Sequence, residues 1–295
     1  MVEQEAAGDL GIEPPTPPRR AAVARVHGAF LVTASLILRT ARPSWRCPKS
    51  AVPLTNDMNW LGWHTAVEIA AHKSMAQLLI GEGIVELQEG RTNEAARCFV
   101  DCIVFAHAAH RRGLIIDELV GIACQAMGSR RLVQVAPHLS PDALREILPA
   151  LVALDQARES AAAIVQRDRE WSRGAYGVWR SIWMSIVMRK SLRAIEASFG
   201  KKQARSVAAL RLVLTELAIR GYQAKNGKPP EALAELVPAW LPAVPLDPFS
   251  QQPLVYRVST NGFLLYSVGP DGKDDQGTPL KQGGVETGDL LPTAL

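Results

Sequence analysis

The sequence predicts an α+β protein, in which a mainly helical region is followed by a small C-terminal domain of one helix and an antiparallel β-hairpin. From about residue 60 apolar residues recur every three or four positions, which is the period of packed helices. Past Pro245 two short runs rich in Val, Leu, Phe and Tyr follow, PLVYRV and GFLLYSV, which are typical of strands. The sequence STNG between them favours a tight turn, so we expect a hairpin.

On this basis we divide the 295 residues into three parts. Residues 1–48 form a lead whose first twenty positions are polar and proline-rich, which is typical of disorder, and whose second half contains a candidate signal anchor. Residues 49–200 form the helical region, and residues 201–295 form the C-terminal domain.

The candidate anchor is Ala21–Leu38. Its eighteen or so mostly apolar residues just reach the length of a membrane span, but Arg25 and His27 fall inside its first half. Three interpretations stay open: a signal anchor with a cytoplasmic N-terminus, a cleaved or vestigial export segment, and an amphipathic soluble helix. The first places the protein in the cell envelope, anchored in the inner membrane with its bulk outside the cytoplasm, and the last leaves it in the cytoplasm.

Composition excludes several classes of function. The net charge is +4 and the pI is near 9.0, with Lys and Arg dispersed among acidic residues, so nucleic acid is not an expected partner. The sequence contains neither a glycine-rich nucleotide-binding motif nor a nucleophile elbow. Four cysteines lack metal-site spacing and are expected to be buried free thiols: residues 47, 98, 102 and 124.

Three features are predicted within the helical region. The apolar rhythm pauses at EGRTN, which predicts a helical hairpin, and one stretch of it resembles a single tetratricopeptide repeat at Gly83, Gly90, Ala95 and Phe99. Ser140 is expected to cap a helix that begins at Pro141, and Pro149 should kink or interrupt that helix. The segment that contains Trp171, Trp179 and Trp183 is expected to form core or an inter-helix surface; a membrane-surface or partner-binding helix is the alternative.

The C-terminal domain has its own sequence of elements. A long amphipathic helix ends at YQAKNGKPP, a short helix EALAEL follows, and Asp247 before Pro248 favours an extended entry into the hairpin. The helix must cover the small sheet for the unit to be stable. We expect the apolar face of the hairpin to consist of Val255, Phe263, Leu265 and Val268.

The segment from Arg205 to Leu291 resembles the C-terminal part of the type II secretion major pseudopilin (protein G-like) family. The matching pieces, in order, are YQAKNGKPP, EALAEL, LDPFSQQPLVYR, GFLLYSVGPDGKD and TGDLL. The resemblance implies a pseudopilin-like domain fused to a helical region, an arrangement seen in uncharacterised bacterial proteins. Because no prepilin-peptidase motif precedes the apolar segment and the helical region intervenes, the resemblance transfers the domain rather than a secretion role. The expected role is a non-enzymatic structural or interaction protein with protein partners in the cell envelope and an association with the membrane.

The resemblance also implies a calcium ion, held by the loop after the last strand together with a later aspartate. The corresponding residues here are Asp271, Asp274, Asp275 and Asp289. Calcium prefers six to eight oxygen ligands, which such a loop can supply, although the spacing is not that of an EF-hand. A solvated acidic turn is the alternative.

The rival function is a helical-bundle metalloenzyme. His64, Glu68 and His72 are spaced four residues apart, which places them on one stripe of a helix. His107 and His110 lie three apart on the second helix of the expected hairpin. Imidazole and carboxylate groups on facing helices can build a metal site in a bundle.

Overall fold

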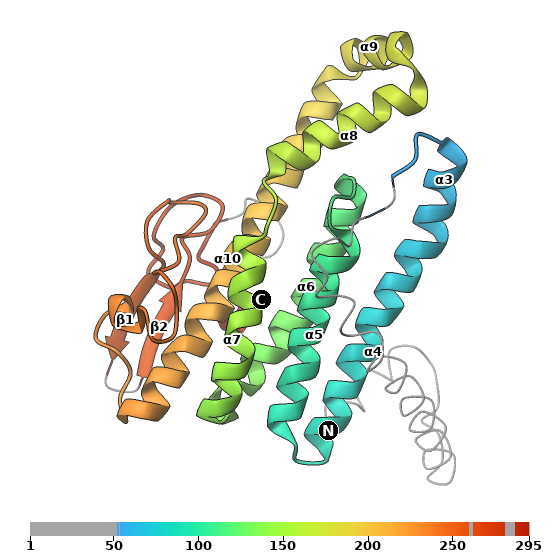
Figure 1. The fold of residues 1–295 in the computed structure, drawn as a ribbon. Helices are drawn as coiled ribbons and strands as arrows, with labels where there is room; N and C mark the ends of the chain where they lie inside the picture. The colour runs from blue at the N-terminus through green and yellow to red at the C-terminus, as the bar shows by residue number, and fades with distance from the viewer. Residues whose placement is uncertain (1–51, 53, 260–261, 281–286, 295) are drawn as a thin grey trace, which may run out of the picture. The chain divides into compact units, whose positions relative to one another are not determined.

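The computed structural model describes residues 52, 54–259, 262–280 and 287–294, all of which belong to one compact unit, Arg42–Leu295. Most of these residues are helical, and an antiparallel two-stranded sheet follows near the C-terminus, so the predicted α+β class is confirmed (Figure 1). None of the helices within the described ranges is long and apolar enough to cross a membrane. The candidate anchor Ala21–Leu38 and the rest of the predicted lead at 1–48 lie outside these ranges.

The predicted helical hairpin is confirmed. Its first arm is a continuous run of three elements, α3 (Met58–Trp63), the π-helical turn η1 (His64–Glu68) and α4 (Ile69–Gln88). Its second arm, α5 (Thr92–His110), is buried along most of its length and packs against α4. The two arms meet closely at Gly83, where a Cβ would lie only 2.3 Å from the Phe99 ring.

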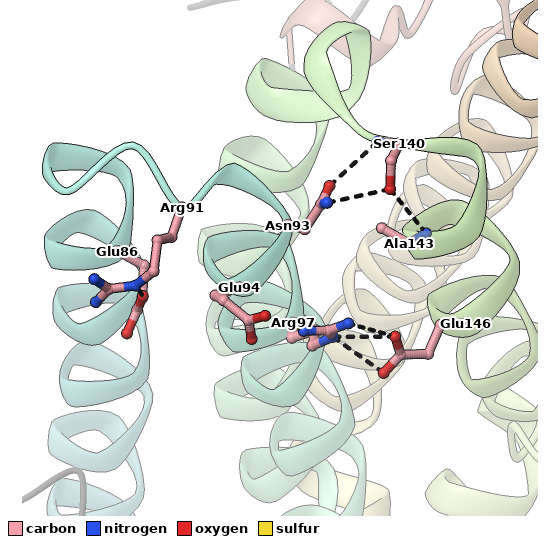
Figure 2. Close-up of polar contacts among 8 residues, drawn as sticks. All are labelled: Glu86, Arg91, Asn93, Glu94, Arg97, Ser140, Ala143 and Glu146. Carbon is pink, nitrogen blue, oxygen red and sulfur yellow. Dashed lines mark hydrogen bonds and ion pairs between the residues drawn. The ribbon is translucent and has the colours of Figure 1, made fainter.

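Two further helices complete this half of the core, α6 (Ile115–Val135) and α7 (Pro141–Gln156), with the short 3-10 turn η2 (Ala136–His138) between them. Ser140 caps α7 as predicted, since its hydroxyl accepts a hydrogen bond from the Ala143 amide at 3.2 Å. Figure 2 shows that Asn93 of α5 completes this corner, donating to the Ser140 hydroxyl at 3.1 Å and accepting from the Ser140 amide at 3.2 Å. Pro149 does not interrupt α7, although it cannot donate a backbone hydrogen bond. The buried Leu148 and Leu151 on either side pack into the core and stabilise the helix there.

Three helices follow: α8 (Ala161–Tyr176), α9 (Val178–Val187) and α10 (Arg189–Asn226). Gly177 separates α8 from α9 with a φ of 81°, a left-handed conformation that favours glycine. The division expected at residue 200 falls inside α10, whose second half packs against α6 and α7. One hydrophobic core therefore includes side chains from both sides of that position.

The C-terminal segment packs against α10. The short predicted helix is a 3-10 turn, η3 (Leu233–Leu236), and the hairpin consists of β1 (Val255–Ser259) and β2 (Gly262–Tyr266). Opposed residues in the register share a face, which places Tyr256 with Leu265 and Val258 with Phe263. The helix covers this face, since the Arg220 guanidinium lies 4.9 Å from the centre of the Phe263 ring.

Two of the four expected members of that face are wrong: Val255, and Val268, which lies beyond the end of β2 at Tyr266. Val255 opposes Tyr266 and so points to the other side of the sheet, away from Leu265. Sequence alone could not decide this, because a shift of one residue in register exchanges the two faces of a strand.

Candidate functional site

The π-helical turn η1 builds the centre of a histidine–carboxylate cluster. Such turns are wider than an α-helical turn and occur frequently at functional sites. The buried His64 stacks on Trp60, with ring centres 4.6 Å apart. Its Nδ1 contacts the Glu68 carboxylate one turn along, and its Nε2 lies 2.6 Å from Oδ1 of Asp117 in α6.

These carboxylates favour the charged form of His64. Burial by itself lowers the pKa of this imidazole, but its hydrogen bonds to Glu68 and Asp117 and their negative charges raise that pKa above its ordinary value. A carboxylate accepts hydrogen bonds only, so two of them favour a ring that carries protons on both nitrogens. Asp117 is fully buried and has a second role, because its Oδ2 accepts from the Leu114 amide at 2.7 Å and so caps the start of α6.

A second pair of imidazoles lies beside this triad. The rings of His72 and His110 meet edge to face with centres 5.0 Å apart. His110 donates from Nδ1 to the Ala106 carbonyl at 2.8 Å, and because that carbonyl can only accept, the proton sits on Nδ1 and Nε2 carries a free lone pair. Burial lowers the pKa of His110 to about 4 and also lowers that of His72. Nε2 of His110 and Nδ1 of His72 are both buried without a hydrogen-bond partner.

The structure thus brings His64, Glu68, His72 and His110 together, as the spacing predicted, but His107 lies elsewhere. Burial lowers the pKa of His107 to about 4, and the positive charges of Arg158 and Arg111 act in the same direction. In the part of the chain that the structure describes, no three His, Cys, Asp or Glu side chains are arranged as ligands of one metal ion. The three cysteines within that part, Cys98, Cys102 and Cys124, are buried as expected and form no disulfide with one another.

Sequence reasoning missed Asp117, which completes the cluster from 53 residues away. Its only signal in the sequence is an acidic residue in the first turn of an apolar helix, which a helix cap explains equally well. The contact with His64 depends on how α4 and α6 pack, and no spacing rule encodes that.

The acidic loop holds the four aspartates of the expected calcium site. Asp274 accepts from the Tyr266 hydroxyl at 2.7 Å, which lowers the pKa of its carboxyl group. Asp289 is fully buried and accepts from the amides of Asp275 and Gly277 at 3.3 and 2.7 Å, so it ties the closing segment to the loop. Burial and the nearby charges of Asp274 and Asp275 raise the pKa of Asp289. One oxygen of Asp275, Oδ2, is buried without a hydrogen-bond partner, while Asp271 accepts from the Lys273 amide at 3.2 Å.

A third feature is an exposed apolar surface. Residues 178–195, which are α9 and the first turns of α10, are termed the apolar arm. The expectation that this segment forms core is wrong for Trp179 and Trp183, which are 85% and 65% exposed, whereas Trp171 of α8 is buried and donates to the Thr55 carbonyl at 2.7 Å. Exposed apolar residues of the arm are Val178, Trp179, Ile182, Trp183, Ile186, Val187, Met188, Leu192 and Ile195.

Comparisons with models of protein families, with curated proteins and with solved structures find no match to this chain. The resemblance of Arg205–Leu291 to major pseudopilins therefore stays a prediction.

Proposed function

We propose that the protein is a non-enzymatic structural or interaction protein of the cell envelope, with a pseudopilin-like C-terminal domain. The observation that carries this proposal is the apolar arm, because monomeric soluble proteins rarely expose a contiguous apolar surface of this kind without a binding role. The order of α10, η3, the β-hairpin and the acidic loop also agrees with what the resemblance implies for the C-terminal domain.

The histidine–carboxylate cluster supports the same proposal. Both ring nitrogens of His64 are hydrogen-bonded, one to Glu68 and the other to Asp117, so neither nitrogen is available to a ligand. The buried contact between His64 and Asp117, in which both ring nitrogens have hydrogen-bond partners, fixes the packing of η1 against α6. The cluster is thus explained as a structural element of the bundle.

A reporter fusion tests the location. Residues 1–60 are fused to an enzyme that is active only outside the cytoplasm, and we expect activity because Ala21–Leu38 directs translocation. A matched fusion with Val32→Glu and Leu36→Glu should be inactive, since charges within the apolar segment prevent its insertion. Silence of the unaltered fusion, together with a soluble full-length protein after fractionation, would overturn the envelope location.

The proposal includes one Ca²⁺ ion in the acidic loop. Asp275 has an unpartnered oxygen, and burial together with repulsion from Asp274 and Asp275 raises the pKa of Asp289. A bound cation would supply a partner to the first and offset the repulsion at the second. Binding at one hundred times the dissociation constant would stabilise the fold by about 2.7 kcal/mol.

Thermal unfolding with millimolar Ca²⁺ and with a chelator tests the calcium site. We expect a higher melting temperature with Ca²⁺ in the wild type and in Asp142→Asn, which changes an exposed aspartate of α7. Asp271→Asn should lose most of the response. Superimposable wild-type curves would leave the loop as a hydrogen-bonded turn.

A second function, a metal centre in the helical bundle, is favoured by one specific observation. His72 and His110 each hold a buried ring nitrogen without a partner, and the proton of His110 is fixed on the other nitrogen by a backbone carbonyl, as in many metal-ligating histidines. Metal analysis of the purified protein distinguishes the two functions. Bound zinc, iron or manganese that is lost in His64→Ala with His72→Ala, but kept in His107→Ala, would favour the metalloenzyme.

A further inference from the structure

The apolar arm has the chemistry of a helix that lies in a membrane surface. Its α9 residues Trp179, Trp183 and Ile186 recur at intervals of three and four, which places them on one side of the helix, and each is more than half exposed. Figure 1 shows α9 at the end of the projection that α8 and the first part of α10 form. A surface at the tip of a projection is free to approach a flat partner.

The charge of the arm is of one sign. Between Trp171 and Ile195 the sequence contains five basic residues and no acidic residue, and the first acidic residue beyond them, Glu196, is held by Arg169 at 2.7 Å. Tryptophan with arginine and lysine around an apolar helix is the composition of interfacial helices that bind anionic lipids. The five basic residues are Arg173, Arg180, Arg189, Lys190 and Arg193.

The apolar surface continues into an open groove of about 670 Å³ beside the arm. Its lining includes Ile182, Leu192 and Ile195 of the arm, together with Leu119 of α6 and Trp171 of α8. The arm therefore has exposed apolar side chains and a groove beside them. Lipid acyl chains, which are flexible and apolar, can follow such an uneven surface.

We propose that the apolar arm docks onto the surface of a membrane that contains anionic lipids, with its tryptophans at the level of the headgroups. This inference rests on the proposed role as an interaction protein. Charge argues against two other occupants. A second arm would bring four basic residues against four of the same sign, and Ala21–Leu38 is itself flanked by Arg19, Arg20, Arg39 and Arg42.

Flotation of the full-length protein with vesicles tests the proposal. We expect at least tenfold more bound protein on vesicles of phosphatidylcholine with phosphatidylglycerol at seven to three than on phosphatidylcholine alone. In the wild type, lipids brominated near the headgroup should quench the tryptophan fluorescence. Because Trp45 lies only seven residues beyond Leu38, the quenching is assigned to the arm by its loss in Trp179→Phe with Trp183→Phe, and quenching that this variant keeps in full would overturn the proposal.

Matched variants locate the contact. Trp179→Phe with Trp183→Phe should still float but lose most of the quenching, whereas Trp179→Glu with Trp183→Glu should lose the anionic-lipid preference and the quenching together. Trp63→Glu, which changes a tryptophan of α3 that is 53% exposed, should behave as wild type. Changing the four arm residues Arg180, Arg189, Lys190 and Arg193 to Gln should reduce the anionic preference at least tenfold, while the same change at exposed Lys201, Lys202, Lys225 and Lys273 should reduce it much less.

Two outcomes would overturn the proposal. If the wild type floats without quenching and the double glutamate variant floats equally well, another segment holds the protein on the vesicle. If the wild type is an oligomer that the double glutamate variant dissociates, and no quenching occurs, a second copy covers the arm. Neither result depends on the reporter fusion, so failure of the cell-envelope location and failure of membrane docking are separate observations.

Discussion

Acidification is expected to weaken the fold through His110, whose buried imidazole has a pKa of about 4 in place of the ordinary 6.5. Between these two pH values His110 is protonated in the unfolded chain but neutral in the folded chain, so the free energy of unfolding rises with pH across this window. The contribution is fully present above pH 6.5 and is lost as pH falls towards 4. The two pKa values give a destabilisation of about 2 kcal/mol at pH 5 and only about 0.2 kcal/mol at pH 7.

His64 acts in the opposite direction. Its pKa is raised in the folded state by Glu68 and Asp117, so its contribution is fully present below its ordinary pKa and is lost as pH rises through the folded value. His107, with a pKa of about 4, adds to the acid sensitivity of His110. The pH dependence of the wild type is the sum of these contributions, and only a variant can isolate one of them.

The measurement is urea unfolding at pH 7 and pH 5 of the wild type and of His110→Asn, whose amide can still donate to the Ala106 carbonyl. We expect the loss of unfolding free energy between the two pH values to be smaller by about 2 kcal/mol in the variant. His138→Asn, which changes an exposed histidine, should keep the pH dependence of the wild type. Equal pH dependence in His110→Asn and the wild type would show that the His110 ring is hydrated or paired, and would refute the reasoning.

Three further predictions concern stability and are read from chemical denaturation at pH 7. Gly128→Ala should lower the free energy of unfolding by about 1–3 kcal/mol, because the added Cβ would lie 2.7 Å from the Phe99 carbonyl oxygen. Gly200→Ala, where the Cβ has no neighbour within 4 Å, should instead raise it by about 0.5–1 kcal/mol, and equal effects of the two changes would contradict the packing of α5 on α6. Ser140→Ala should lower the free energy of unfolding by about 1–2 kcal/mol, because it removes a helix cap and a hydrogen bond from Asn93. Ser160→Ala removes the same type of cap without a bond to Asn93 and should lower it by about 1 kcal/mol or less; the reverse order would argue against the contacts drawn in Figure 2. Asp247→Ala should cost about 2–4 kcal/mol, since this buried carboxylate accepts from the Phe249 and Val268 amides at 2.9 and 2.8 Å; a loss below about 0.5 kcal/mol would mean that water replaces it.

The elements of the fold were largely predictable because their signals are local. Apolar periodicity, the pause at EGRTN, the cap at Ser140 and the turn at STNG each depend on residues a few positions apart, and each corresponds to an observed boundary within the described residues. The register of the hairpin was not predictable in the same way, because both faces of β1 carry apolar residues. Val255 was therefore placed with Leu265, although the observed pairing puts Tyr256 there.

In the candidate site, too, local features were predictable and features that depend on tertiary packing were not. The stripe of His64, Glu68 and His72 could be predicted from helical spacing, but the π-helical turn and the contact with Asp117 could not, since both depend on tertiary packing. His107 and His110 are three residues apart and would share a face on spacing alone. Their surroundings differ because His110 packs against His72 while His107 lies near Arg111 and Arg158.

The apolar arm shows why a strongly apolar stretch does not by itself predict burial. Between Val178 and Val187 the only charged residue is Arg180, so the polar side of α9 is only a weak sign of solvent exposure. Burial requires that other elements offer apolar surface in return, and here the preceding helix is polar: α8 buries only Ile164 and Trp171. The core of the bundle is formed by α4 to α7 and the second half of α10. Most apolar side chains of α9 stay exposed, although this helix contacts α8 and α10. The decisive quantity is therefore the apolar surface that neighbouring elements offer, and the sequence of α9 alone does not contain that information.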